Sequence, residues 1–143
     1  MQLNIETDYA VRTVLYLTDK QGYEPSGRIA QSMVIDHDVL KKILHRLQKA
    51  GIVRSRSGAD GGYALSRPAE NISLLSVIET MEGTIKINRC LEHDGYCNRK
   101  MSGSCSVHRF YSSVQSMLEQ AFGNTTIQDL YDGNTAFAGL DAK

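Results

Sequence analysis

One stretch, residues 26–67, constrains the fold of this chain more than any other. Its first half predicts two short helices separated by a tight turn. Ser26 is the expected N-cap of the first helix and Asp36 that of the second, because these side chains accept hydrogen bonds from free helix amides. Gly51 suits the position after the last turn of the second helix. The apolar side chains at helical spacing are Ile29, Ala30 and Met33 in the first helix and Val39, Leu40, Ile43, Leu44 and Leu47 in the second.

Two strand-like runs complete this stretch. Residues 52–56 and 63–66 are the predicted strands, and the Gly-rich residues 58–62 between them suit a hairpin loop. Helix, turn, helix and hairpin within about 40 residues is typical of a winged helix-turn-helix unit, whose second helix enters the major groove of DNA. We therefore predict a mainly α fold with a small β wing and a double-stranded DNA operator as its partner.

The charge distribution agrees with a DNA-binding surface. Residues 26–67 contain eight Lys and Arg against three Asp and Glu, whereas the rest of the chain has eight against thirteen. A basic segment in a chain of zero formal net charge is expected where one surface meets phosphate, although solvated helix faces also carry such charges. The predicted DNA-binding residues are Arg28, Asp36, His37, Asp38, Val39, Lys41, Lys42, Arg46, Arg56 and Ser57.

The remaining segments predict further helices and three regions. We assign residues 1–83 to the winged helix-turn-helix, residues 84–131 to a cysteine-bearing loop with a long helix, and residues 132–143 to a disordered tail. Residues 1–5 are expected to be extended. The other predicted helices run from about 6 to 19, from the N-cap Ser73 to the stop signal Gly83, from about Val107 to Gly123, and from the N-cap Thr126 to Tyr131.

Length and hydropathy exclude other classes of protein. A chain of 143 residues suits one domain with an extension. No apolar run approaches the ~18 residues of a membrane span, and the start of the chain lacks the basic and apolar regions of a signal peptide. We expect a cytoplasmic protein with no membrane partner.

The long helix predicted at 107–123 carries more apolar surface than a small winged domain covers. Its apolar side is formed by Phe110, Tyr111, Val114, Met117, Leu118, Ala121 and Phe122. Packing within the chain is the alternative, but a homodimer also suits DNA reading, because twofold proteins bind half-sites about 34–36 Å apart. We therefore predict a C-terminal dimerisation helix.

Three cysteines precede this helix in a polar segment. Cys90, Cys97 and Cys105 have the spacing Cys-x6-Cys-x7-Cys, and His108 follows three residues after the last. Structural cysteines usually have apolar neighbours, and a reducing compartment disfavours disulfides, so a soft-metal centre, either iron–sulfur or zinc, is the favoured interpretation. The absence of a Cys-x-x-Cys pair favours a cluster over structural zinc, and a metal-free redox switch is the other alternative.

Several motifs together resemble a known family. They are the opening MQLNIETDYAVRTVLYL, the wing segment LQKAGIVRSRSGADGGYALSRP, the helix ISLLSVIETMEG, the three-cysteine loop and TTIQDL near the end. The chain resembles the Rrf2 family of bacterial winged-helix transcriptional regulators, and in particular its IscR-, NsrR- and RirA-like branches. The resemblance implies a dimer whose operator binding is tuned by an iron–sulfur cluster, with Cys90, Cys97 and Cys105 as cluster ligands.

The resemblance leaves the fourth cluster ligand open. His108 matches the IscR pattern, in which a histidine completes a two-iron cluster. Asp8 matches the NsrR pattern, in which an aspartate donated by the partner subunit completes a four-iron cluster. Both residues also have structural explanations, Asp8 as an acid in the first turn of a helix and His108 as a surface residue.

The wing departs from the family pattern at one position. Family wings commonly place Arg immediately before the first glycine of the tip, where it contacts the minor groove. Here Ser57 occupies that position and Arg56 precedes it. Because a shift of one residue along a strand turns the side chain to the opposite face, Arg56 either reaches the groove through a bulge or contributes less to DNA reading.

Two functions of different classes follow from these patterns. The first is a dimeric transcriptional regulator, expected to be a repressor, whose iron–sulfur cluster senses cluster demand, iron, nitric oxide or redox state. The second is a thiol or iron–sulfur redox enzyme that contains a helix-turn-helix. The sequence contains no clear nucleophile–base pair, and the glycines at 58–62 lack the Lys-Ser/Thr that completes a phosphate-binding loop, so we do not expect an enzyme.

Overall fold

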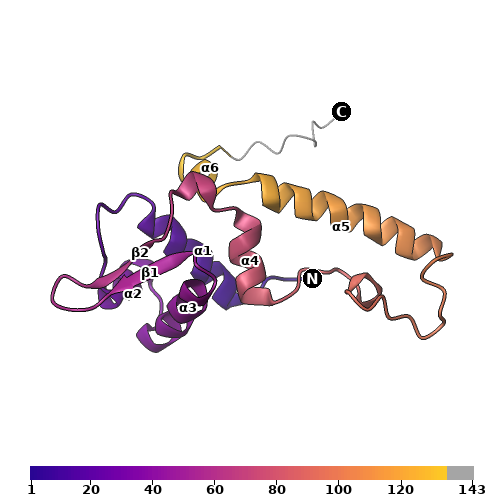
Figure 1. Ribbon diagram of the computed structural model, residues 1–143, viewed down its shortest axis with the longest axis horizontal. Coiled ribbons are helices and arrows are strands. Elements are labelled where there is room, and N and C mark those ends of the chain that lie inside the picture. Colours follow the sequence, from indigo (N-terminus) through magenta and orange to yellow (C-terminus); the bar gives the residue numbers. More distant parts are fainter. Residues whose placement is uncertain (135–143) are drawn as a thin grey trace.

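The computed structural model describes residues 1–134 and has two parts (Figure 1). A winged-helix body is followed by a long helix, α5, which extends away from the body and carries the cysteine-bearing loop at its outer end (Figure 1). This arrangement confirms the mainly α fold with a small β wing. The elements are α1 (Ile5–Leu17), α2 (Ser26–Met33), α3 (His37–Lys49), β1 (Val53–Arg56), β2 (Gly62–Leu65), η1 (Ala69–Asn71), α4 (Leu74–Glu82), η2 (Arg89–Leu91), α5 (Ser106–Asn124) and α6 (Ile127–Tyr131).

The turn between α2 and α3 shows one correct and one wrong capping prediction. Asp36 caps α3, since its carboxylate accepts from the backbone N–H groups of Asp38 and Val39 at 3.0 and 3.1 Å. Ser26, in contrast, is the first residue of α2 and caps nothing, because Pro25 occupies the N-cap position. The Ser26 hydroxyl instead lies 2.8 Å from Nε2 of His37 and joins the starts of the two helices.

The buried face of α3 forms the centre of the core. Its side chains pack with those of α1, α2 and α4, and the first residue of α6 closes the core from the other end. Burying an aliphatic side chain of this size stabilises the fold by about 1.5–3 kcal/mol. The fully buried apolar residues include Leu40, Ile43, Leu44 and Leu47 of α3, Ala10 and Val14 of α1, Ile29 of α2, Val77 and Ile78 of α4, and Ile127 of α6.

The wing has a third segment that the sequence pattern did not indicate. β1 and β2 pair antiparallel from Val53↔Leu65 to Arg56↔Gly62. The linker before α2 then pairs with the other edge of β2, because Glu24 and Tyr63 exchange backbone hydrogen bonds of 2.9 and 2.8 Å. Gly62 is required at this crossing, since a Cβ there would lie 2.2 Å from the Glu24 carbonyl oxygen.

Several helix ends differ from the predicted ones by one or a few residues. α1 begins at Ile5, because the Asn4 side chain caps it, and ends at Leu17 rather than near Asp19. α5 continues one residue beyond Gly123.

Residues 135–143 of the predicted disordered tail lie outside the described residues. No helix within residues 1–134 is long and apolar enough to cross a membrane.

The C-terminal end of α4 joins three elements of the body. Arg46 of α3 donates two hydrogen bonds of 2.8 Å to the carbonyl oxygens of Thr80 and Met81. Glu82 accepts from the backbone N–H of Asn4 at 2.7 Å and from the hydroxyl of Thr7, which is fully buried in α1. These contacts satisfy carbonyl groups that a helix end otherwise leaves without partners, and they fix α4 against α1 and α3.

We predict that Glu82→Gln destabilises this junction in a pH-dependent way. The Thr7 hydroxyl and the Asn4 amide hold the pKa of Glu82 below its ordinary value of 4.5. The stabilisation is therefore present above pH 4.5 and is lost as the pH falls through the lower pKa of the folded protein. At neutral pH the variant should lose about 1 kcal/mol of unfolding free energy, because a charged acceptor is replaced by a neutral one.

Urea unfolding at a fixed protein concentration, between pH 7 and pH 3, measures this difference. Glu79→Gln, an exposed acid on the same helix, is the control and should match the wild type. A difference between Glu82→Gln and the wild type that persists unchanged at pH 3 would contradict the assignment.

Candidate DNA-binding surface and cysteine pocket

The exposed face of α3 presents the predicted DNA-binding residues in an accessible arrangement. Lys41 and Lys42 are exposed, as are His37 and Asp38 in the first turn. Lys41 Nζ lies 3.7 Å from an Asp38 carboxylate oxygen, a weak pair that leaves the cation free to meet phosphate. Val39 is half-buried at the margin of this face.

Arg28 extends the basic surface onto α2. Its side chain is 66% exposed, and its guanidinium lies 3.8 Å from the Glu24 carboxylate. The first turns of α2 and α3 are adjacent through the contact between Ser26 and His37, so Arg28 and the start of α3 belong to one surface. The His37 ring is therefore held by a neighbour rather than free in solvent.

Arg46 makes contacts within the body that its prediction as a DNA-binding residue did not include. Its guanidinium donates to the two carbonyl groups at the end of α4 and lies 3.9 Å from the Glu6 carboxylate. Arg46 therefore positions α3 within the body, and we leave it out of the proposed DNA interface. The sequence could not show this role, because its partners lie 34 and 35 residues away.

The wing pairs in regular register up to Arg56, without a bulge. Arg56 donates to the Asp60 carbonyl oxygen across the loop at 2.8 Å, and Ser57 is exposed at the start of that loop. Arg54 and Arg56 alternate with Ser55, whose hydroxyl accepts from Gln48 of α3. Both arginines consequently lie on the face of the wing turned away from α3.

The three cysteines and His108 line one open pocket at the outer end of α5. The pocket has a volume of about 360 Å³, and its other lining residues include Arg89, Tyr96 and Val107. All three cysteines are half-buried and none forms a disulfide. The structure thus gathers the four predicted ligands that belong to this segment around a common space.

Polar groups of the loop and of α5 act on the sulfur atoms of the cysteines. The backbone N–H of His108 donates to Sγ of Cys105 at 3.4 Å, and Nδ1 of His108 lies 3.3 Å from Sγ of Cys90. The backbone N–H groups of Met101 and Arg99 lower the pKa of the Cys97 thiol from its ordinary value. Such donors stabilise thiolate, the form of cysteine that binds metal.

An ion pair shapes the loop between the first two cysteines. The Arg89 guanidinium holds the Asp94 carboxylate with two hydrogen bonds and lowers the pKa of that carboxyl to about 2. The same guanidinium lies 5.4 Å from the centre of the Tyr96 ring. These contacts order the segment, and no pattern in the sequence predicted them.

The candidate ligands are not arranged as a site for a single metal ion. Among residues 1–134, no group of three or more His, Cys, Asp or Glu side chains is close enough to hold a metal ion. The donor set still fits an iron–sulfur cluster in its chemistry, because three thiols with amide donors and a nearby imidazole are the ligands such clusters use.

Asp8, the other candidate for the fourth ligand, lies apart from this pocket within the chain. It belongs to α1 in the body and forms an ion pair with Arg12, one turn later. The cysteine-bearing loop lies at the opposite end of α5 (Figure 1). Asp8 could reach the pocket only from a partner subunit, whereas His108 is already there.

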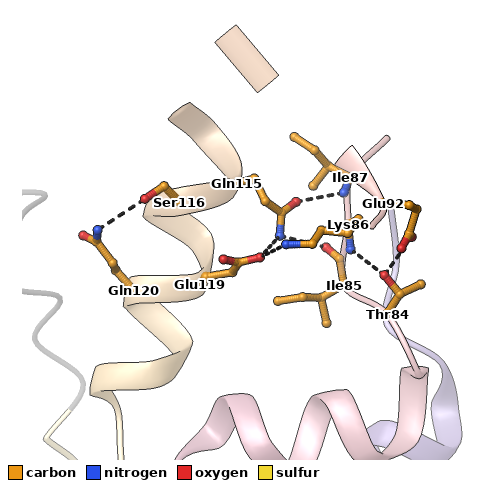
Figure 2. Close-up of polar contacts among 9 residues, drawn as sticks. All are labelled: Thr84, Ile85, Lys86, Ile87, Glu92, Gln115, Ser116, Glu119 and Gln120. Atoms are coloured by element: carbon orange, nitrogen blue, oxygen red, sulfur yellow. Dashed lines mark hydrogen bonds and ion pairs between the residues drawn. The ribbon is translucent and has the colours of Figure 1, made fainter. Parts of the chain in front are cut away.

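Gln115 fixes the segment that leads to the cysteines against α5 (Figure 2). Only 4% of this residue is exposed, and it is the buried residue of α5. Its amide oxygen accepts from the Ile87 N–H at 2.9 Å, and its amide nitrogen donates to the Ile85 carbonyl at 3.3 Å and to Glu119 at 3.0 Å. Lys86 pairs with the same carboxylate of Glu119. In the sequence, Gln115 is marked only as a polar residue next to the apolar Val114, and Gln115 was not among the residues predicted to have a role.

The winged body, its exposed basic helix and the separate cysteine pocket define a helix-turn-helix DNA-binding regulator. Residues 3–133 match the model of the Rrf2 family, described as an iron-dependent transcriptional regulator. This chain belongs to the Rrf2 family, which confirms the resemblance drawn from its motifs. Regulators of this family are transcription factors rather than enzymes.

Individual relatives agree with this membership, and solved structures share the fold. The chain is 26% identical to the HTH-type transcriptional regulator IscR of Serratia proteamaculans, over 99% of this chain and 85% of the relative. The fold is similar to that of T. potens IscR, with a TM-score of 0.73 and 21% identity over 100% and 94% of the two chains. It is also similar to CymR, the global cysteine regulator of B. subtilis, with a TM-score of 0.71 and 24% identity over 93% and 98%.

We predict that Gln115→Leu lowers the unfolding free energy by about 1–3 kcal/mol, because the Ile87 N–H and the Ile85 carbonyl lose their buried partner. Chemical denaturation measures the loss. Gln120→Leu is the matched control, since Gln120 lies on the exposed side of the same helix and, among residues 1–134, its side chain bonds only to Ser116 (Figure 2). Equal stability of the two variants would show that the Gln115 amide does not hold this segment.

Proposed function

We propose that this chain is a homodimeric transcriptional regulator, acting as a repressor in the cytoplasm, whose operator binding is controlled by an iron–sulfur cluster. The cluster would be held by Cys90, Cys97 and Cys105, with His108 as the favoured fourth ligand. The observation that carries the proposal is the single pocket that these four residues line beside the first turn of α5. Sequence similarity to IscR and the iron-dependent description of the family support it.

The apolar face of α5 supports the homodimer. Phe110 and Met117 are 65% and 53% exposed in the single chain. Together with Val107, Val114 and Ala121 they recur at alternating intervals of three and four residues, which is the spacing of a two-helix seam. A second copy of α5 is the partner that such a seam fits, and it would bring two α3 helices into one assembly on DNA.

Cluster loading would act on DNA binding through the segment between α4 and the cysteines. When bound, a cluster would supply iron that cross-links the thiolates, and this iron can change its oxidation state or its ligands. This chain contributes the path from the pocket to α3: Gln115 holds residues 85–87 on α5, and Arg46 holds the end of α4 against α3. A shift in the cysteine-bearing loop can therefore change the geometry of α3 relative to a partner subunit.

The redox-enzyme alternative receives no support from the relatives, which are regulators. The described residues also present no nucleophile–base arrangement in the cysteine pocket beyond the contact of His108 with Cys90. We interpret that contact as ligand positioning.

For DNA binding, we predict that Lys42→Ala weakens binding to duplexes of any sequence, because Lys42 is exposed on α3 and contacts phosphate rather than bases. If about four phosphates are neutralised per subunit, log K of the wild type should change with log salt with a slope of about −7, and the variant should have a shallower slope. Fluorescence anisotropy from 50 to 300 mM salt, roughly the range in which such effects are resolved, measures the affinity and the salt slope.

Arg99→Ala in the cysteine-bearing loop removes the same charge and is the control. A wild-type slope near zero would refute a phosphate-dominated interface.

For the cluster, we predict that Cys97→Ala removes the visible chromophore and the iron of anaerobically purified protein. His108→Ala should shorten the lifetime of the chromophore in air, whereas Asp8→Ala and the loop control His93→Ala should leave it unchanged. Iron and sulfide counts with absorption spectra measure these effects. Full iron content in Cys97→Ala would refute the ligand set, and a labile cluster in Asp8→Ala alone would transfer the fourth position to Asp8 of the partner subunit.

A further inference from the structure

One face of the wing carries an aromatic ring between two arginines. Tyr23 lies in the linker before α2, and its ring centre is 5.5 Å from the Arg54 guanidinium carbon and 4.4 Å from that of Arg56. Each distance is within the range of a cation–π contact. The two arginines come from β1, so a residue far from the hairpin in sequence orders both of them.

The wing has the geometry to place Tyr23 there. Because Glu24 pairs with Tyr63 on the free edge of β2, Tyr23 lies in line with Ala64 and Arg54 across the three segments. The intervening residues of β2 on this face are Ala64 and Gly62, which have little or no side chain. The ring can therefore reach across β2 to both guanidinium groups.

The surface around this ring is strongly basic. An open basin of about 600 Å³ is lined by Tyr23, Lys20, Arg54, Arg56 and Arg67, and no acidic residue lines it. Lys20 is paired with Asp19 at 3.0 Å, and Arg67 is anchored to the carbonyl oxygens of Gly51 and Asn71. Within the described residues, Arg54 has no ion-pair partner, and Arg56 donates only to the Asp60 carbonyl. The remaining N–H donors of the two guanidinium groups are suited to bind an anionic ligand.

We propose that this surface, which we call the Tyr23 face and define as Tyr23, Arg54, Arg56 and Arg67, is a second DNA contact. It binds the phosphodiester backbone beside the groove that α3 enters, and Tyr23 is the positioning residue that holds Arg54 and Arg56 for that contact. The surface faces away from α3, because Ser55 on the opposite side of β1 contacts Gln48 of that helix. The two contacts therefore meet separate stretches of the duplex. The proposal rests on DNA binding by α3, and it adds Tyr23, Arg54 and Arg67 to the wing residues Arg56 and Ser57 that were predicted to bind DNA.

The test compares variants on a labelled 40-base-pair duplex of generic sequence, about the length that covers two half-sites with flanks. Arg54→Gln should weaken binding on the order of tenfold at 0.1 M salt, and its slope of log K against log salt should be shallower by about 0.9 for each phosphate that the variant no longer neutralises. Arg109→Gln, the same charge change at an exposed position of α5, should have neither effect.

The positioning role of Tyr23 has its own variants. Tyr23→Leu should weaken binding about threefold to tenfold, because the variant has no ring to hold the two guanidinium groups, while Tyr23→Phe keeps the ring and should bind like the wild type. Circular dichroism melting checks that Tyr23→Leu is folded; if it is not, the comparison of Tyr23→Phe with Arg54→Gln still tests the face, since the ring without its hydroxyl must retain the full salt slope.

The outcomes separate this inference from the proposed function. If the wild type binds and Arg54→Gln matches Arg109→Gln in affinity and slope, the Tyr23 face is not a DNA contact. If Tyr23→Leu is folded and binds like the wild type, Tyr23 does not position the arginines. A wild type that fails to bind any duplex would instead refute DNA binding itself.

Discussion

The contacts at the C-terminal end of α4 fix this helix against α1 and α3 within the winged-helix body. Arg46 reaches from α3 to the last carbonyl groups of α4, and Glu82 reaches back to Asn4 and Thr7 of α1. A guanidinium placed on free carbonyl groups also complements the negative end of the helix dipole. The chain turns at Gly83 immediately afterwards, so this junction is one of the places where the cysteine-bearing segment joins the body.

The outer segment is tied to α5 rather than to the body. Gln115 provides a donor and an acceptor to residues 85–87, much as a neighbouring strand would, and the pair of Lys86 with Glu119 adds a second link (Figure 2). The cysteine pocket then lies between this segment and the start of α5, where Cys105 caps the helix through its sulfur atom. A change in sulfur ligation would therefore act on the first turn of the helix that carries the exposed apolar seam.

Patterns of neighbouring residues predicted the helices and strands, but they could not predict contacts between residues that are far apart in the sequence. The caps Asp36, Ser73 and Thr126 were correct, because each needs only partners two or three residues away. Ser26 was assigned the wrong role, since Pro25 takes the N-cap position and the serine hydroxyl finds His37 instead. Arg46 shows the same limit, because a basic residue on a helix looks alike from the sequence whether it faces DNA or a neighbouring carbonyl group.

The candidate site was predictable in its residues but not in its arrangement. The spacing of the cysteines and His108 indicated a common centre, and the structure brings these residues to one pocket. Nothing in the spacing indicated the N–H donors of residues 99–101 to Cys97, or the pair of Arg89 with Asp94, because both depend on how the loop folds. The Tyr23 face depends on strand pairing between a linker and β2, which no local pattern marks.

In the proposed mechanism, the state of the cysteine pocket controls DNA affinity. This coupling is measured as the dissociation constant for one promoter duplex of the cluster-loaded protein and of the same preparation after anaerobic cluster removal, at one salt concentration. We expect the two constants to differ by about fivefold or more, the usual range for coupled sites, while sedimentation shows the same dimer. Equal constants for loaded and cluster-free protein would contradict the mechanism.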